Sequence, residues 1–275
     1  MGGGGGFRVG LCTVTLRSLD PAEVVRLAAS AGVEVLEWGG DVHVPPGDTT
    51  AAARARRLSE AAGLGVLSYG SYLFLDATTA TGPSDGIDAV LDTAVELGAR
   101  WVRVWAGMGV EPDGTGADWE AVAAAGRRVA AAAAARGLLL VLEFHGGTPT
   151  ATAAGTVRLL DAVGSPACLT AWQPPYWDPL DAARESTDLA ALSPRLAHLH
   201  VYDWDADGTR HSLARTRGRW VRRVRAAVAA GGAVPAGVPR GALVEFLPGD
   251  DPAALAGEVT VLRDVLGVAG AHATG

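Results

Sequence analysis

Eight strand-like runs alternate with helix-like runs along most of the chain, and this alternation restricts the fold more than any other feature. The runs cover residues 7–16, 33–39, 65–73, 101–107, 138–144, 168–174, 196–203 and 241–247. Asp20 and Asp251, each followed by Pro, mark helix starts, while Gly32 and Gly98 mark helix stops. Eight β-then-α units predict one α/β domain, a (β/α)8 TIM barrel.

A doubly wound open sheet shares this alternation, so two further features decide between the folds. No G-x-G-x-x-G turn follows the first strand-like run, and the count of eight favours a closed barrel. We expect one barrel domain over residues 7–267, with a flexible Gly-rich leader at 1–6 and a flexible tail at 268–275. The stretch at about 204–218, rich in Asp, Arg and Gly, is predicted to be a mobile substrate loop.

Composition excludes several classes of function. The net charge of -7 and the pI near 5.3 argue against a nucleic-acid partner. All 23 basic residues are Arg, which excludes a Schiff base on an enzyme lysine and a Walker-type phosphate loop. No apolar run is long enough for a membrane span, and Cys12 and Cys168 have no disulfide or zinc spacing. The start, MGGGGGF, lacks a basic region followed by an apolar core, so we expect no signal peptide. A cytoplasmic location is expected.

Four consecutive strand-like runs in the second half carry a polar side chain at or near their ends. These residues are Glu143, Gln173, His200 and Glu245. A barrel of parallel strands gathers such ends around one cavity, so distant residues could share a site. Either Glu alone could simply pair with an arginine, but two Glu and a His on one rim favour a functional site. Two carboxylates, an imidazole and an amide oxygen suit Mn²⁺, Mg²⁺ or a similar ion.

The histidines of the seventh and fifth strand-like runs add to this prediction. His198 and His200 alternate along one strand and should point to the same side. His200 lies nearer the C-terminal end and is the predicted ligand, whereas His198 either hydrogen-bonds in the core or supports a ligand. His145 comes two residues after Glu143 and should contact substrate or orient a ligand.

Aromatic residues also gather at or just beyond the C-terminal strand ends. They are Trp38, Trp105, Trp172, Tyr176, Trp177 and Trp204. Any one of them could serve core packing alone. Six at the same end favour a platform that stacks against a sugar face or an aromatic aglycone.

Several segments resemble the sugar phosphate isomerase/epimerase family, whose members have a xylose-isomerase-like barrel. The segments are E-W-G-G-D-V-H-V-P-P-G-D at 37–48, R-V-W-A-G at 103–107, L-E-F-H at 142–145, H-L-H-V-Y-D-W at 198–204 and V-E-F at 244–246. The resemblance extends over about residues 8–266. It implies that a Glu, an Asp, a His and a Glu hold one divalent ion. It also implies that the two glutamates move a proton between adjacent carbons of a sugar.

Carried over to this chain, the resemblance makes Glu143, His200 and Glu245 metal ligands, and the two glutamates catalytic. The substrate contacts implied by the resemblance and by the aromatic strand ends are Trp38, His43, Trp105, His145, Arg210 and His211. Two positions depart from the family: Gln173 stands where it has an Asp, and Tyr202 where it has a Lys. A Gln oxygen can coordinate a metal but adds no negative charge, so metal affinity should be lower.

The leading functional prediction is a divalent-metal-assisted isomerase or epimerase of a sugar or sugar-like ketone, working through an enediolate. Mn²⁺ is the first choice of ion, with Mg²⁺, Co²⁺ or Zn²⁺ as alternatives. A lyase or deglycosylase that cleaves a bond of a sugar or glycoside is the second hypothesis. A degenerate barrel that only binds carbohydrate is the third, motivated by Gln173. The expected partner is a small carbohydrate or glycoside, without nucleic acid or membrane, and a homo-oligomer stays open.

Overall fold

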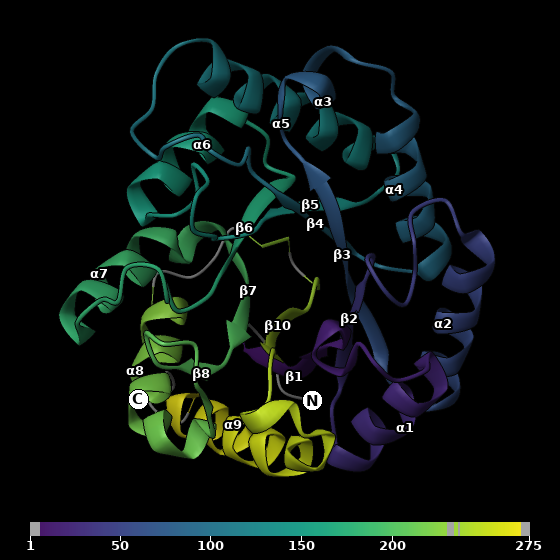
Figure 1. The fold of residues 1–275 in the computed structure, drawn as a ribbon, viewed down its shortest axis with the longest axis vertical. Helices are drawn as coiled ribbons and strands as arrows, with labels where there is room; N and C mark the ends of the chain where they lie inside the picture. The colour runs from purple at the N-terminus through teal and green to yellow at the C-terminus, as the bar shows by residue number, and fades with distance from the viewer. Residues whose placement is uncertain (1–5, 230–233, 236, 271–275) are drawn as a thin grey trace.

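In the computed structural model, eight parallel strands close into a barrel and helices surround it (Figure 1). The structure describes residues 6–229, 234–235 and 237–270. The barrel strands are β1 Phe7–Cys12, β2 Val35–Gly39, β3 Gly65–Phe74, β4 Trp101–Trp105, β5 Leu139–Leu142, β6 Cys168–Trp172, β7 Leu196–Val201 and β10 Arg240–Val244. Because β1 pairs with both β2 and β10, the sheet has no free edge, and the predicted TIM barrel is confirmed.

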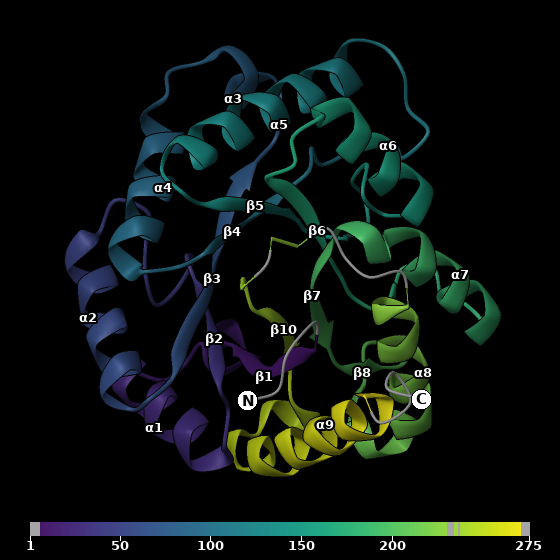
Figure 2. The same cartoon turned by 180° about the vertical axis from the view of Figure 1, so that it is seen from behind.

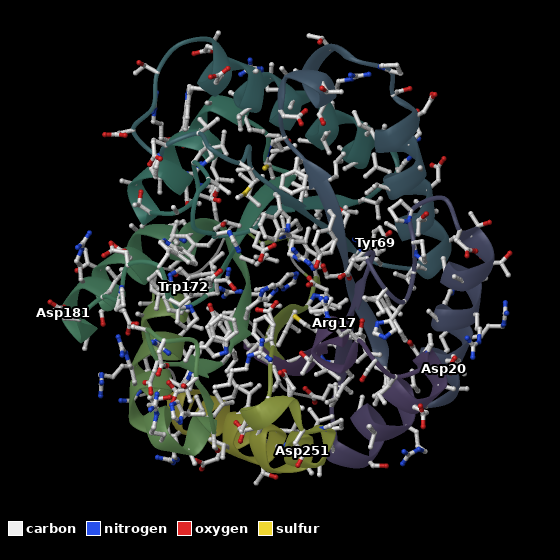
Figure 3. All side chains as sticks on the ribbon, in the orientation of Figure 1. Arg17, Asp20, Tyr69, Trp172, Asp181 and Asp251 are labelled. Carbon is white, nitrogen blue, oxygen red and sulfur yellow. The ribbon has the colours of Figure 1, made fainter. Side chains whose placement is uncertain are left out.

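The helices form an outer ring, as both views of the ribbon show (Figure 2). They are α1 Pro21–Ala31, α2 Thr49–Ala61, α3 Ala77–Thr81, α4 Asp85–Leu97, α5 Ala117–Ala135, α6 Ala153–Val163, α7 Ala182–Leu192, α8 Arg217–Val228 and α9 Leu255–Gly270. Asp20 caps α1 by accepting a hydrogen bond from the Ala22 backbone N–H, and Gly32 ends it in the left-handed region. The capping Asp20 and Asp181 lie out in the helical ring, whereas Tyr69 lies toward the centre (Figure 3).

The predicted boundaries at the ends of the chain can be compared only in part. Helix α9 continues through Gly270 and so includes the first residues of the predicted tail. Residues 1–5 of the predicted leader and 271–275 of the tail lie outside the described residues. Within the described ranges, no helix is long and apolar enough to cross a membrane.

The predicted loop at 204–218 contains regular structure. Strand β8, Asp203–Trp204, pairs antiparallel with β9, Arg210–His211, and a 3-10 turn over Leu213–Thr216 leads into α8. Arg215 ties this segment together because its guanidinium contacts Asp203 at 2.7 Å and Asp205 at 2.8 Å. The segment is therefore a small hairpin over the C-terminal end of β7.

The barrel interior changes character along the strands. The part of the interior that comes before the charged residues along the strands is an apolar plug, defined here as Val35, Leu67, Trp101, Val141, Leu169 and Leu243. Glycines make room for it: a Cβ on Gly10 would lie 2.2 Å from Leu243, and one on Gly241 would lie 2.4 Å from Leu67. Two residues after the plug residues of β2, β4, β5 and β10, the same inward-facing positions carry Glu37, Arg103, Glu143 and Glu245, because side chains of a strand alternate between its faces.

Outside the barrel, Glu185 on α7 makes an ion pair with two arginines of α8. Its carboxylate accepts hydrogen bonds from Arg223 at 2.6 Å and from Arg219 at 2.9 Å, and it is almost fully buried. Burial raises the pKa of Glu185, but Arg223 and Arg219 outweigh this effect and leave it below its ordinary value. A carboxyl with a lowered folded pKa stabilises the fold above its unfolded pKa, and this stabilisation is lost as pH falls through the folded pKa.

We expect Glu185→Gln to lower the free energy of unfolding by about 3 kcal/mol at neutral pH, because it leaves Arg223 buried without its counter-ion. The difference from wild type should shrink as acid protonates the wild-type carboxyl, below the ordinary range of a glutamate. Urea unfolding over a series of neutral to acidic buffers measures both effects. Glu60→Gln, which removes an exposed pair with Arg56, is the matched control and should cost less than about 1 kcal/mol. An equal loss in the two variants would contradict this account.

Candidate active site

A cavity of about 210 Å³ opens at the C-terminal end of the barrel. It is lined by Val14, Arg17, Tyr72, Arg103, Trp105, Glu143, His145, Gln173, Tyr176, Trp204, Glu245 and Phe246. Glu143, Gln173 and Glu245 each follow directly after the last residue of β5, β6 and β10, so closure of the sheet brings them to one rim. His200, near the end of β7, places Nδ1 3.3 Å from Oε2 of Glu245. All four predicted ligands thus belong to one region.

Alternating charges connect the two predicted catalytic glutamates. Beyond Glu245, His200 Nε2 lies 3.6 Å from Oε1 of Glu37 on β2. The same Oε1 accepts a hydrogen bond from Nε of Arg103 on β4 at 3.1 Å, and Nη1 of Arg103 donates to Glu143. All five side chains are buried. We call Glu245, His200, Glu37, Arg103 and Glu143 the ion chain; its guanidinium carries a permanent positive charge.

The members of the ion chain differ in how their charge is held. Burial would raise the pKa of Glu37, but Arg103 and His200 outweigh it and hold that pKa at about 2. Burial raises the pKa of Glu143 above its ordinary value, although Arg103 opposes it. Burial would lower the pKa of His200, but Glu245 and Glu37 raise it to about 9. Glu37 is therefore a fixed anion, whereas Glu143 is the carboxyl that takes up a proton more readily than an ordinary glutamate.

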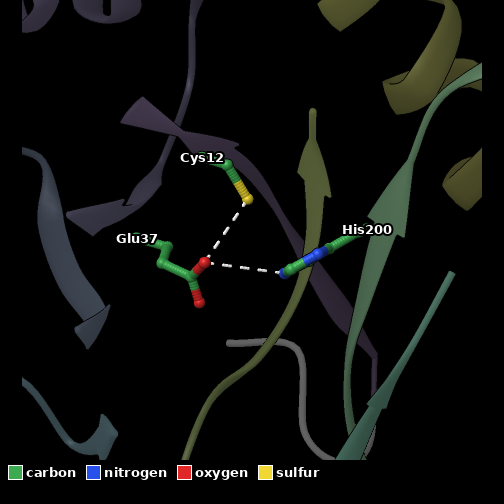
Figure 4. A group of neighbouring side chains, drawn as sticks. All are labelled: Cys12, Glu37 and His200. Carbon is green, nitrogen blue, oxygen red and sulfur yellow. Dashed lines mark hydrogen bonds and ion pairs between the residues drawn. The ribbon is translucent and has the colours of Figure 1, made fainter. Parts of the chain in front are cut away.

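Three residues of the site are spaced so that they could hold a metal ion. The ligand atoms of Cys12, Glu37 and His200 all lie within 4.8 Å of one another, and Figure 4 shows them converging on Oε1 of Glu37. Glu143 does not join this group; its carboxylate instead pairs with Arg103. Among the described residues, the structure therefore groups His200 with Glu37 rather than with Glu143.

Unpartnered atoms test whether a cation fits here. Oε2 of Glu37, Oε2 of Glu245 and Nε2 of His200 are buried without a hydrogen-bond partner. Leaving such atoms unpaired is costly, and a cation bound at an unprotonated Nε2 of His200 would satisfy that nitrogen together with Glu37. Gln173 uses its amide Nε2 to donate to the Phe144 carbonyl at 2.7 Å, which fixes the side chain. Cys12, Glu37 and Nε2 of His200 therefore fit a divalent ion, whereas Glu245 faces Nδ1 on the other side of the imidazole.

Two predicted substrate contacts, Trp105 and His145, line the cavity. Their ring centroids are 4.1 Å apart, and His145 Nδ1 lies 2.8 Å from the Gly146 carbonyl oxygen. Nε2 of His145 lies 3.4 Å from the Tyr176 hydroxyl at the cavity wall. The backbone contact orients the imidazole, so that its other nitrogen faces the cavity side.

Trp38 and His43 are not among the residues that line the cavity. Trp38 is fully buried, and its indole N–H donates to Ser59 at 3.2 Å. Both ring nitrogens of His43 have partners, the Thr13 hydroxyl at 3.0 Å and the Leu19 carbonyl at 3.2 Å. These contacts hold β2 and its following loop in place, and the substrate contacts expected of Trp38 and His43 stay predictions.

Arg210 and His211 are not among the residues that line the cavity. The aromatic residues that do line it, Tyr72, Trp105, Tyr176, Trp204 and Phe246, are called the aromatic wall here. The Arg210 guanidinium lies 4.5 Å from the ring centroid of Phe246 and pairs with Asp250. His211 Nε2 lies 2.6 Å from Oδ2 of Asp205, within the β8–β9 hairpin. Arg210 therefore supports the aromatic ring of Phe246, and direct substrate contacts of Arg210 and His211 stay predictions.

His198 is a core histidine below the ion chain. Its Nδ1 accepts a hydrogen bond from the Gly241 backbone N–H at 3.2 Å, and its ring meets Trp101 edge-on at 5.1 Å. Burial lowers the pKa of His198 to about 3, so it is neutral at physiological pH. Of the two roles left open from sequence, the structure shows the hydrogen-bonded core residue.

Glu37, Arg103, Tyr72 and Phe246 belong to the site although no strand-end pattern predicted them. Glu37 and Arg103 each place a charge at an inward-facing position of an apolar strand. This sequence pattern could have identified them as site residues. Phe246 has a positive φ of 64°, which is unfavourable for a non-glycine residue and occurs where surrounding contacts enforce it. Its backbone N–H donates to the Thr15 hydroxyl at 3.1 Å. This bond helps hold the ring at the cavity wall.

Gly70 on β3 leaves the space that the ion chain occupies. A Cβ at this position would lie 2.7 Å from Nη2 of Arg103 and 3.0 Å from Oε1 of Glu37. We expect Gly70→Ala to displace this buried pair and to lower the free energy of unfolding by about 1–3 kcal/mol, as overpacking usually does. Gly257→Ala on α9, where a Cβ meets no atom within 4 Å, is the matched control. Thermal unfolding distinguishes them, and equal stability of the two variants would refute the steric argument.

Comparison with known proteins agrees with the fold. The family model described as xylose isomerase-like TIM barrel matches residues 25–233. Similar solved structures include an L-ribulose 3-epimerase, at 17% identity and a TM-score of 0.71, covering 98% of this chain and 97% of the other. A second is a xylose isomerase-like TIM barrel protein from Mycobacterium smegmatis in complex with magnesium, at 15% identity and a TM-score of 0.67, covering 96% and 97%.

A third similar structure is the probable 3-DHS dehydratase AsbF from Bacillus anthracis, at 18% identity and a TM-score of 0.69, covering 94% of this chain and 99% of the other. At these identities the structural likeness shows the fold alone. No curated protein matches the chain in sequence. The family match spans well over half of the chain, so this protein belongs to the xylose isomerase-like TIM-barrel family.

Proposed function

We propose that this protein is an isomerase or epimerase of a sugar or sugar-like ketone, with Glu143 and Glu245 as its acid and base. One observation carries the proposal: both glutamates line the same cavity and stand at opposite ends of the ion chain. Two carboxyl groups around one substrate can act on the two sides of a carbonyl-bearing carbon pair. An acid and a base placed in this way can move a proton between adjacent carbons or to the opposite face of one carbon.

In the proposed reaction, one glutamate takes the proton from the carbon next to the carbonyl. The electron pair of that C–H bond forms a C=C bond, and the π pair of the carbonyl moves onto its oxygen, which gives an enediolate. The other glutamate protonates the same carbon from the opposite face to give the epimer, or the neighbouring carbon to give the isomer, in which case the hydroxyl proton passes to the former carbonyl oxygen. Arg103 lines the cavity between buried carboxylates and supplies a fixed positive charge near the developing oxyanion. His145 orients a substrate oxygen from the cavity wall.

The proposal includes a divalent ion, Mn²⁺ first, held by His200 with Glu245, Gln173 and Glu143, for which Glu143 would exchange its pairing with Arg103 for the ion. When bound, such an ion would polarise the substrate carbonyl and hydroxyl oxygens. The short distance between Oε2 of Glu245 and the His200 imidazole supports placing these two ligands together. Elemental analysis of the purified protein and titration of Mn²⁺ into the metal-free protein test it without reference to activity. Failure of Mn²⁺ to bind would remove the ion from the proposal while leaving the glutamates in place.

Hydrogen exchange tests the reaction itself. The protein is incubated in D₂O with a panel of ketoses, and NMR follows loss of the C–H signal next to the carbonyl. We expect exchange with at least one ketose, accompanied by appearance of its isomer or epimer. Absence of exchange across the panel in metal-loaded protein would favour a barrel that binds carbohydrate without catalysis.

A second candidate is cleavage of a sugar or glycoside bond at the same site. The aromatic wall favours it, since Tyr72 stacks near Trp105 at 6.1 Å and Trp204 meets Phe246 at 4.6 Å between ring centroids. Such a wall could hold an aglycone while the same glutamates form the enediolate and the substituent leaves. Release of the substituent from an oxidised glycoside would select this candidate, whereas exchange without release selects the isomerase.

A further inference from the structure

A second cavity of about 250 Å³ adjoins the candidate active site. Tyr176 and Trp204 line both cavities, and their ring centroids are 5.0 Å apart. Tyr202 continues the same aromatic wall, with its ring centroid 5.0 Å from that of Trp204. Tyr176 and Trp204 therefore stand at the boundary between the two neighbouring cavities.

The second cavity is polar, and its charges are already paired. Glu185 accepts hydrogen bonds from both Arg219 and Arg223 at the base of the cavity. Asp203 and Asp205, on the hairpin side, are both bound by Arg215. Because these charges neutralise one another, no charged ligand is needed to balance them. Their remaining oxygen lone pairs and N–H groups can still form hydrogen bonds with hydroxyl groups. The walls thus suit a neutral group rich in hydroxyls rather than a phosphate.

Aromatic faces beside carboxylates and guanidinium groups match the two sides of a sugar ring. The ring's C–H face packs on an aromatic plane, and its hydroxyls reach the polar groups. We propose that this second cavity is a subsite for a second sugar ring, so that the substrate is a ketose-containing disaccharide or a related glycoside. This inference rests on the proposed function only in placing the reacting sugar in the first cavity.

Binding measurements test the subsite directly. Isothermal titration compares D-fructose with the ketose disaccharides lactulose and palatinose, in wild type and in Glu143→Gln. We expect at least one disaccharide to bind more than tenfold tighter than fructose. Ala206→Trp fills the second cavity from its exposed rim and should remove this tenfold preference, while Ala206→Ser should keep it.

The outcomes separate the subsite from the proposed function. A disaccharide preference that Ala206→Trp abolishes supports the subsite, even if no sugar exchanges hydrogen in D₂O and the proposed reaction fails. Hydrogen exchange with fructose but equal binding of mono- and disaccharides overturns the subsite and leaves the reaction standing. A disaccharide preference that persists in Ala206→Trp, once circular dichroism has confirmed that this variant is folded, also overturns the subsite. Absence of binding by both disaccharides overturns it as well.

Discussion

Glu143→Gln and Glu245→Gln are each expected to lower turnover by about 10³-fold, because an amide can neither take nor return the proton. Both changes keep the size of the side chain, and the amide oxygen introduced by Glu143→Gln can still accept a hydrogen bond from Arg103. The barrel should therefore stay folded, as circular dichroism would show. Appearance of the isomer or epimer, followed by NMR on whichever ketose the wild type accepts, measures the loss.

The double variant adds a sharper test. If the two glutamates act in one proton relay through substrate, removing the second should cost little more than removing the first. Glu60→Gln on the exposed face of α2 is the control and should keep wild-type turnover. Turnover within tenfold of wild type in both single variants would refute the assigned roles. Losses that multiply in the double variant would instead show that the glutamates act independently.

The fold could be predicted from sequence because its signals are local and repeated. The strands are apolar runs, and helices such as α1 and α4 carry their own start or stop residue, Asp20 and Gly98. Eight repetitions of one unit leave few architectures. The order of the strands follows from the same repetition, since each β-α unit places its strand beside the previous one.

The site was predicted only where a polar residue ends a strand. Glu143 and Glu245 stand out in sequence because the apolar run stops at them. Glu37 and Arg103 lie at inward-facing positions inside apolar runs, and their pairing depends on two strands that are 66 residues apart. Sequence alone could not show that this buried arginine takes one of the predicted ligands, Glu143, as its counter-ion.

The direction in which each side chain points explains why Trp105 lines the cavity and Trp38 does not. Trp38 and Trp105 both lie at strand ends, yet Trp38 points into the layer between barrel and helices, where Ser59 of α2 receives its N–H. Trp105 follows Arg103 by two positions and so shares its inward face. A one-position shift along a strand reverses the side, and strand-end predictions from sequence do not fix that position.

Strand β4 presents the three layers of the barrel in turn: Trp101 in the apolar plug, Arg103 in the ion chain and Trp105 in the cavity wall. Trp101 is fully buried, and its indole N–H donates to the Pro239 carbonyl at 3.3 Å. We expect Trp101→Ala to lower the free energy of unfolding by about 3–5 kcal/mol, because the cavity it leaves is enclosed by barrel strands that cannot collapse into it.

Trp101→Phe is the matched control for this prediction. It keeps an aromatic ring in the plug and loses part of the volume and the hydrogen bond to Pro239, so its cost should be nearer about 1–2 kcal/mol. Urea unfolding measures both losses, provided that the slope of the unfolding free energy against urea concentration is the same as in wild type. Arg103 lies next to the plug on β4, so the larger void of Trp101→Ala should also loosen the ion chain. Exchange of the substrate C–H hydrogen in D₂O should therefore be slower in Trp101→Ala than in Trp101→Phe. A stability loss below about 1 kcal/mol for Trp101→Ala would show that the plug is not what supports the charged layer.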